Sequence, residues 1–330
     1  MSVRSERTIR IAWCSASILA LAACGDAATE RSGGSASTAD LPPGAEAISL
    51  LGDTLMAPEQ PDNVREVYLA RYAEAEDDLV EAPEDVDALI WMGRRTAYLG
   101  QYRAAIDVFT HAISLHPDDP RLYRHRGHRY LTVRELDAAI ADFERAVELT
   151  EGQPDEVEPD GLPNAQNVPT STLQFNIWYH LALAHYVKGA LEQALEAQRR
   201  CLEVSEHPDS VVATSYWLYM TLMRLGMEEE AEEVLSSISE DMEIIESTAY
   251  LDLLLLFKGE RSYDDVVGPS GDEATLQSTT AAYGLGVWHF LEGRTEEAHA
   301  AWERMMEARN QWPAFGYLAA EGELARSAMR

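Results

Sequence analysis

Pairs of identical residues recur 34 positions apart in the first half of the chain, and this spacing constrains the fold more than any other feature. The pairs are Gly93 and Gly127, Ala105 and Ala139, Phe109 and Phe143, and Ala112 and Ala146. A period of this length is typical of one supersecondary unit, which cannot bury its apolar face unless neighbouring units stack on it. We therefore expect a row of stacked units.

Apolar residues outside these pairs follow a helical spacing. Beyond residue 61 they recur every three or four positions, at Val64, Val67, Tyr68, Tyr72, Ala75 and Leu79. These intervals place one apolar face along a helix, whereas strand-like alternation is hard to find. The chain has 330 residues, 46% of them hydrophobic, which is enough for a sizeable core. We predict an all-α body.

Residues 86–119 and 120–153 each carry one pattern of large, small and aromatic residues spread over two helices. The first copy has Leu89, Met92, Gly93, Gly100, Tyr102, Ala105, Phe109, Ala112 and Pro117. The second has Tyr123, Gly127, Tyr130, Leu136, Ala139, Phe143 and Ala146, with Arg126 and Glu151 where an apolar residue and a proline are usual. This pattern resembles the tetratricopeptide repeat. The resemblance implies a right-handed α-solenoid of about five to six helix pairs, some irregular, with an N-terminal lead helix and a C-terminal capping helix.

The later units match the pattern more loosely. We expect a lead helical segment at 46–85, units 1 and 2 at 86–153, a proline-rich insertion at 154–174, and units 3 to 6 with the capping helix at 175–327. The non-repeating stretch begins at residue 152, and its prolines 154, 159, 163 and 169 forbid a continuous helix. It is either a disordered spacer or an ordered loop lying across the solenoid.

The N-terminus carries the features of an export signal. Three arginines within residues 4–10 precede an apolar run at 11–20 that is too short to span a bilayer as a mature helix. The run ends in Leu-Ala-Ala-Cys-Gly at 21–25, which resembles the lipobox of bacterial lipoproteins. The resemblance implies a signal peptide at 1–23, lipidation of Cys24 and a flexible tether at 24–45, with an ordinary cleaved signal as the alternative. Gly25 favours the periplasmic face of the outer membrane over the outer face of the inner membrane.

The formal charge limits the class of partner. The chain has 26 Lys and Arg against 57 Asp and Glu, a net charge of −31, which argues against nucleic acid. The stretch from Arg94 to Arg134 departs from this balance, with eight arginines against three acidic residues. Positive charge is therefore concentrated in the first two repeats.

The family resemblance also predicts where a partner binds, because the first helix of each tetratricopeptide pair lines the concave surface. The residues expected there are Trp91, Arg94, Tyr98, Arg121, Arg124, His125, His128, Asn176, Tyr179, His180 and Tyr186. Arginine forks bind carboxylates in a bidentate manner, and aromatic rings supply stacking area, so this strip suits an acidic or C-terminal segment of a protein partner. The alternative is that the arginines pair with the protein's own carboxylates.

Signals for catalysis and cofactors are weak. The sequence has no HExxH pattern, Gly-rich phosphate loop or nucleophile elbow, so we predict no enzyme activity, no cofactor and no metal. The favoured function is a membrane-anchored scaffold or adaptor. One alternative is a self-assembling structural envelope protein that dimerises through Trp312, Phe315 and Tyr317. A metal-binding protein or enzyme built on the histidines is the other.

Overall fold

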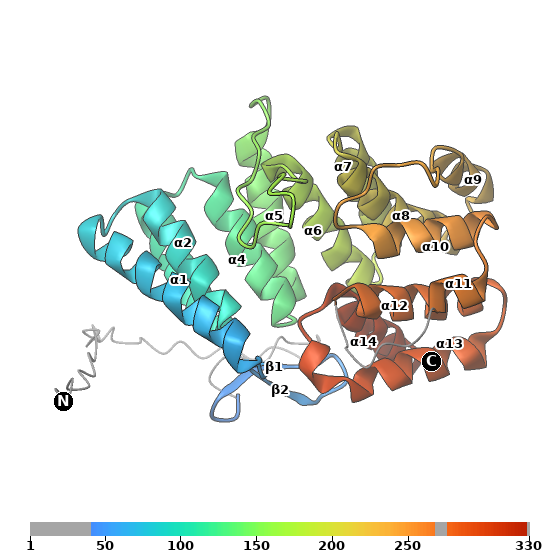
Figure 1. Ribbon diagram of the computed structural model, residues 1–330, viewed down its shortest axis with the longest axis horizontal. Coiled ribbons are helices and arrows are strands. Elements are labelled where there is room, and N and C mark those ends of the chain that lie inside the picture. The colour runs from blue at the N-terminus through green and yellow to red at the C-terminus, as the bar shows by residue number, and fades with distance from the viewer. Residues whose placement is uncertain (1–40, 268–275, 329–330) are drawn as a thin grey trace, which may run out of the picture. The chain divides into compact units, whose positions relative to one another are not determined.

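The computed structural model of the protein describes residues 41–267 and 276–328, so the predicted signal peptide, Cys24 and most of the predicted tether lie outside the described residues (Figure 1). The strands are β1 (Ala45–Ile48) and β2 (Thr54–Met56), and the helices are α1 (Asp62–Glu81), α2 (Val86–Tyr98), α3 (Tyr102–Leu115), α4 (Pro120–Thr132), α5 (Leu136–Thr150), α6 (Leu173–Lys188), α7 (Leu191–Glu203), α8 (Pro208–Arg224), α9 (Glu228–Ser236), α10 (Thr248–Lys258), α11 (Tyr263–Val267), α12 (Leu276–Leu291), α13 (Thr295–Glu307) and α14 (Phe315–Ala328), with a 3-10 helix η2 at Arg309–Gln311.

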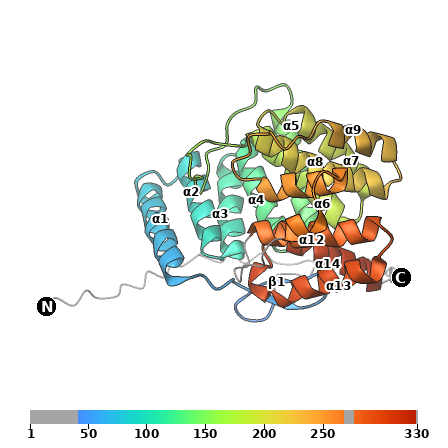
Figure 2. The same ribbon diagram turned by 45° about the vertical axis from the view of Figure 1, so that its right-hand side comes forward.

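Helices α2 to α13 follow one another as consecutive pairs, and each pair packs on the next (Figures 1 and 2). Helix α1 packs on the first pair, and α14 packs on α12, α13 and α6. Helix α11 has only five residues, so the pair that begins with α10 has a short second helix. The prediction of an all-α solenoid of helix pairs is confirmed.

Small residues of the repeat leave room for the aromatic residue of the same pair. A Cβ atom built on Gly93 would lie 2.4 Å from Cζ of Phe109, and one on Gly127 would lie 2.9 Å from Cε1 of Phe143. Both phenylalanines are almost completely buried. The 34-residue spacing of Gly and Phe therefore reflects one close helix crossing made twice.

Local signals set the start of several helices. The Asp85 carboxylate accepts the Ala88 amide at the N-terminus of α2, and Thr172 does the same for Phe175 in α6. Proline is the first residue of α4 and of α8, where its missing amide hydrogen is not needed. These caps satisfy amides that have no partner within the helix.

The turn between the two helices of a pair contains a residue with a left-handed backbone. These residues are Gly100 (φ 79°), Arg134 (φ 68°), Gly189 (φ 84°), Gly226 (φ 72°), Gly259 (φ 79°) and Gly293 (φ 76°). Arg134 is the one arginine in the series, although this backbone is strained by roughly 1–2 kcal/mol for a residue with a Cβ. Its side chain explains the exception.

Arg134 forms a buried ion pair with Glu321 of α14, and the two side chains are 2% and 0% exposed. The Arg134 Nε and Nη2 atoms donate to the Glu321 carboxylate at 3.1 and 2.6 Å, and Nη2 also donates to the Trp312 carbonyl at 2.8 Å. The same carboxylate accepts the Leu50 amide at 3.2 Å. One pair of charges thus joins the second repeat, the N-terminal hairpin and the C-terminal helix.

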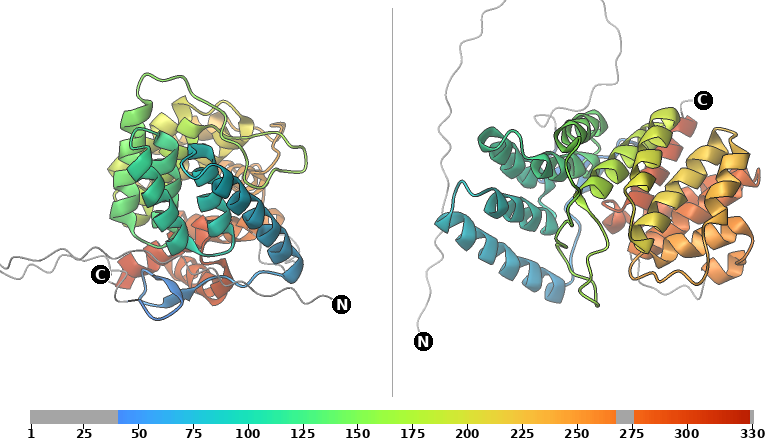
Figure 3. Two further views of the ribbon diagram at one scale, coloured as in Figure 1. Left: turned by 90° about the vertical axis from the view of Figure 1, so that its left-hand side faces the viewer. Right: turned by 90° about the horizontal axis from the view of Figure 1, so that it is seen from above.

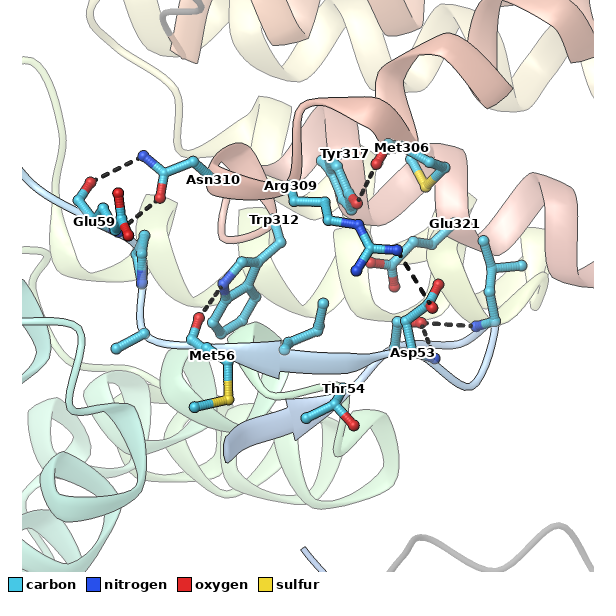
Figure 4. A pocket seen from close by; sticks show the side chains of 15 residues that line it. Asp53, Thr54, Met56, Glu59, Met306, Arg309, Asn310, Trp312, Tyr317 and Glu321 are labelled. Atoms are coloured by element: carbon cyan, nitrogen blue, oxygen red, sulfur yellow. Dashed lines mark hydrogen bonds and ion pairs between the residues drawn. The ribbon is translucent and has the colours of Figure 1, made fainter. Parts of the chain in front are cut away.

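The prediction of a helical segment from residue 46 is wrong for its first part. Residues 45–56 form an antiparallel hairpin, and α1 begins only at Asp62. Gly52 in the turn has φ 91°, and prolines at 58 and 61 prevent an earlier start of the helix. The hairpin is held by the C-terminal segment, because Trp312 Nε1 donates to the Met56 carbonyl at 2.7 Å (Figure 4).

Candidate functional site: an arginine-lined groove

Five of the predicted partner-binding residues line one hollow of about 110 Å³ between α2 and α4. They are Arg94, Tyr98, Arg124, His125 and His128, and the other lining residues are Ala97, Phe109, Arg129 and Glu158. We call this hollow the arginine groove. Glu158 comes from the insertion between α5 and α6, so the groove is formed by two repeats and a loop.

Arg124 lies at the base of the arginine groove and is only 7% exposed. Its Nε lies 2.8 Å from Oε2 of Glu158. Its Nη1 donates to Nδ1 of His125 at 3.1 Å and, more weakly, to Nδ1 of His128 at 3.4 Å. Because a guanidinium can only donate, both Nδ1 atoms must be unprotonated acceptors.

The histidines of the groove are held in the neutral form. Burial lowers the pKa of His125, His128 and His180 well below the usual value, and the charges of nearby arginines lower it further. The rings also pack as aromatic groups, with His125 stacked on Phe109 at 5.6 Å and His128 against His180 at 4.4 Å. His125 and His128 thus line the wall of the arginine groove without adding positive charge, and His180 packs behind His128.

Trp91, Arg94 and Arg95 are stacked on one another on α2. The guanidinium carbons of Arg94 and Arg95 lie 4.4 and 4.6 Å from the centroid of the Trp91 ring. Cation–π contact of this kind holds an arginine in place while leaving its N–H groups free to donate. Arg95 was not among the predicted residues, although it lies next to Arg94 in sequence.

The predicted residues of α6 lie deeper than the sequence indicated. Asn176, Tyr179 and His180 are buried, and Tyr179 accepts a hydrogen bond from Trp217 Nε1 at 2.8 Å. Tyr186 is completely buried, and its hydroxyl accepts from Tyr283. The structure therefore places Tyr186 in the core, because later repeats cover the face of α6 that would otherwise be open.

Arg121 lies outside the arginine groove. It pairs with Asp119 at 2.6 Å and with Asp87 at 2.7 Å, and hydrogen bonds to Asp119 raise its pKa. Three more arginines of the basic stretch pair with the protein's own carboxylates: Arg103 with Glu135, Arg126 with Asp142, and Arg134 with Glu321. For these four arginines the structure favours internal pairing. Among the described residues, Arg94 and Arg129 have no carboxylate partner.

The insertion lies across the solenoid, where Glu158 and Gly161 contact side chains of the helices. It leaves α5, runs over the arginine groove and returns to α6, and the view from above shows it between the N-terminal and C-terminal helices (Figure 3). Val157 and Thr172 form an antiparallel bridge at its base. Its tip is also bonded beside the groove, where the Gly161 carbonyl accepts from Arg71 at 3.1 Å and from Arg95 at 2.8 Å.

A second hollow of about 420 Å³ adjoins the arginine groove, because His128 lines both. It is mostly apolar, and we call it the aromatic hollow. Its other lining residues are Glu246, Ser247, Ala249, Tyr250, Thr280, Pro313, Ala314 and Phe315. The arginine groove and the aromatic hollow together form a surface on which charged and apolar side chains of one ligand could be bound.

A third hollow, of about 490 Å³, lies where the N-terminal hairpin meets the segment 306–321 (Figure 4). Its polar residues mostly bond to each other across the hollow. The Glu59 amide donates to Asn310 Oδ1 at 2.7 Å, Asn310 Nδ2 donates to the Glu59 carbonyl at 2.9 Å, and Arg309 lies 3.7 Å from Asp53. These contacts join the N-terminal hairpin region to the C-terminal segment.

The C-terminal aromatic residues predicted for self-association are largely internal. Trp312 and Tyr317 are 2% and 4% exposed, and only Phe315 is partly accessible, in the aromatic hollow. Between residues 41 and 328, excluding 268–275, no three His, Cys, Asp or Glu side chains are grouped to hold a metal ion. No helix in the described part of the chain has the length and apolar character to cross a membrane.

Comparison with known protein families explains the helix pairs. Residues 92–154 and 175–208 match models of the tetratricopeptide repeat. These two segments are tetratricopeptide repeats. The matched repeats supply α4, α6 and most of α2, which line or adjoin the arginine groove. Repeats of this type serve as surfaces for protein–protein interaction.

Solved structures with a partial likeness include MamA and two proteins described as having TPR or TPR-like repeats. A crystal structure of MamA is 17% identical, with 52% of this chain and 86% of that chain covered and a TM-score of 0.40. YrrB, described as a TPR protein with an unusual peptide-binding site, is 15% identical, with 74% and 95% covered and a TM-score of 0.41. A Podosopora anserina putative kinesin light chain with TPR-like repeats is 16% identical, with 69% and 96% covered and a TM-score of 0.41. With TM-scores below 0.5, these likenesses carry no argument about function. No curated protein matches the chain.

Proposed function

We propose that this protein is a scaffold or adaptor of the cell envelope, anchored through a lipid on Cys24, that binds an acidic segment of a protein partner. The arginine groove carries the binding part of the proposal. Arg94, Arg124 and Arg129 converge on it, and among the described residues the acidic side chain that lines it belongs to Glu158 of the insertion. Since the protein as a whole has a charge of −31, this local excess of arginine is a specific feature of the surface.

The aromatic hollow supplies the apolar half of the surface. Partly buried rings of Tyr250 and Phe315 line it, and aromatic side chains offer large contact area at small entropic cost. A partner segment that places a carboxylate in the arginine groove and an apolar side chain in the aromatic hollow would use both. No residue of this surface is proposed to act as a catalyst.

Site-specific photo-crosslinking in the host cell tests the binding surface. A benzophenone amino acid replaces Ala249, which lines the aromatic hollow, and the matched control replaces Glu196, an exposed residue of α7 that lines neither hollow. We expect a discrete protein adduct from position 249 and none from position 196. Equal adducts from both positions, or none from position 249, would contradict binding at this surface.

The anchor is tested separately. We expect Cys24→Ser to release the protein from the membrane fraction and to remove the acyl mass from the mature N-terminus. Cys201→Ser is the matched control, because Cys201 is completely buried and cannot be acylated in the folded protein. Unchanged membrane association of the Cys24→Ser variant would exclude the lipid anchor. Density-gradient separation of the two membranes then tests the preference for the outer membrane.

A further inference from the structure

The tip of the insertion occupies the arginine groove in the manner of a bound peptide. We call residues 158–161, Glu-Pro-Asp-Gly, the groove arm. Its first residue places a carboxylate 2.8 Å from Nε of Arg124, and its last residue presents a carbonyl to Nη1 of both Arg71 and Arg95. The four residues form neither helix nor strand, and the Glu158 amide donates to the Ser171 carbonyl at 3.2 Å.

The groove is shaped around the last residue of the groove arm. A Cβ atom built on Gly161 would lie 1.6 Å from the Tyr98 hydroxyl oxygen and 2.8 Å from Nη2 of Arg94. Tyr98 is itself stacked on Tyr68 at 5.7 Å, which limits its movement. A residue with a side chain would fit at this point only if the Tyr98 and Arg94 side chains moved away. The groove thus has two selective positions, one for a carboxylate and one, three residues later, for glycine.

The attachments of the groove arm are polar, and its apolar neighbours are exposed. Val157 is 60% and Leu162 is 43% exposed, so neither side chain anchors the arm in the core. The Arg124–Glu158 ion pair is buried, with side chains 8% and 10% exposed, so a ligand that displaces the arm must supply a carboxylate to Arg124 in place of Glu158. By contrast, the aromatic rings beneath the arm are part of the packed repeats. The arm can therefore leave without unfolding the solenoid.

Positive charge in the groove exceeds what the groove arm neutralises. Arg71, Arg94, Arg95, Arg124 and Arg129 surround it, while the arm supplies the carboxylates of Glu158 and Asp160. Among the described residues, Glu158 is the one carboxylate that forms an ion pair with any of these five arginines. A more acidic ligand would use donors that the arm leaves without a charged partner.

We infer that the groove arm is an intramolecular stand-in for the partner and that a partner binds by displacing it. The partner segment is an extended acidic peptide with a carboxylate followed three residues later by glycine, the spacing of Glu158 and Gly161. The inference rests on the proposed function, since it names the chemistry of the partner at the same surface. An intramolecular ligand acts at an effective concentration in the millimolar range, so it excludes weak acidic competitors and admits a partner that makes additional contacts, as in the aromatic hollow.

The test adds the sequence of the groove arm as a separate peptide to the full-length protein in detergent. The variant Glu158→Ala with Gly161→Val removes the carboxylate and forces the arm away from Tyr98. The probe is a fluorescent peptide with the sequence of residues 155–163, DEVEPDGLP, and the matched control peptide is DEVQPDGLP, which lacks the carboxylate equivalent to that of Glu158. Fluorescence anisotropy measures binding of each peptide to the variant and to the wild type.

We expect the variant to bind the probe peptide at least tenfold more tightly than the wild type does. The affinity of the variant for the control peptide should be at least tenfold weaker than its affinity for the probe. Equal affinity of variant and wild type, or no binding by a variant with wild-type circular dichroism, would overturn the inference. If the variant does not fold, hydrogen exchange on the wild type decides. Excess probe should then speed exchange of the Glu158 amide, which donates to the Ser171 carbonyl at 3.2 Å, and leave α3 unchanged, whereas no change at Glu158 refutes displacement.

The two proposals fail in different ways. Crosslinking at position 249 without any probe binding would leave the partner-binding surface standing and reject the groove arm as its template. Probe binding without crosslinked partner would show a competent groove that has no client under the conditions of growth. The absence of both signals would show that the arginine groove takes no part in partner binding.

Discussion

The buried ion pair between Arg134 and Glu321 supports a quantitative prediction about how the solenoid is closed. The two side chains are 2% and 0% exposed, and the carboxylate serves both the guanidinium and the Leu50 amide. Removing one charge leaves the other buried without a partner, which costs about 3–5 kcal/mol. We expect Glu321→Met and Arg134→Met each to lower the free energy of unfolding by that amount.

The double variant separates this account from simple loss of packing. When both charges are removed, no unpaired charge remains buried, so the double variant should be no less stable than either single variant. The coupling energy between the two substitutions should therefore be about 3 kcal/mol or more. Part of the loss will persist because the Trp312 carbonyl and the Leu50 amide lose their partners. Urea denaturation followed by circular dichroism measures all three variants.

An exposed pair in the same protein is the matched control. Lys188 and Asp137 form an ion pair with side chains 48% and 77% exposed, and the same cycle there should give a coupling below about 1 kcal/mol. Additive losses at Arg134 and Glu321, or equal coupling at the two sites, would refute the reasoning. Such a result would mean that water reaches the carboxylate and that the hairpin and α14 are not joined through it.

Three further predictions concern the packed repeats and their titratable groups. Gly93→Ala should lower the free energy of unfolding by about 1–3 kcal/mol in urea denaturation, because the new methyl group meets the buried Phe109 ring at 2.4 Å; an unchanged midpoint would contradict the close crossing. The free energy of unfolding should fall between pH 7.5 and 5.5 by up to about 1.4 kcal/mol for each of His125, His128 and His180. Burial lowers the pKa of these side chains in the folded protein, whereas the unfolded chain takes up protons below about pH 6.5. Equal stability at both pH values would show that the rings are protonated or exposed when the protein is folded. Cys201 should resist a thiol reagent at pH 8 in the native protein and react on denaturation, because burial raises its pKa to about 12; rapid native labelling would place it at the surface.

Much of the fold follows from local sequence. The 34-residue recurrence of Gly93 and Phe109 at Gly127 and Phe143 predicts one helix crossing made twice, and the structure contains both. Such features can be derived from sequence because each repeat contacts mainly its neighbours, so the pattern of small and aromatic residues carries the packing rule within a short stretch of chain. The all-α class follows from the same periodicity.

The function of each arginine could not be derived in this way. Arg121, Arg124 and Arg134 look alike in the sequence, yet one pairs with carboxylates of the repeats, one meets the insertion, and one is buried against the C-terminal helix. Burial and partner set the energy of a charge, and those partners come from distant parts of the chain.

For the hairpin and the insertion, too, the tertiary contacts could not be derived from the sequence. The prolines of the insertion exclude a helix there, and Gly161 gives no sequence signal of its contact with Tyr98. The sequence by itself determined the repeating helix pair, because its contacts are local and periodic. Only the tertiary structure decided that the insertion fills the arginine groove and that the hairpin meets α14. In both contacts the two segments belong to no common sequence repeat, so no periodic pattern predicts that they meet.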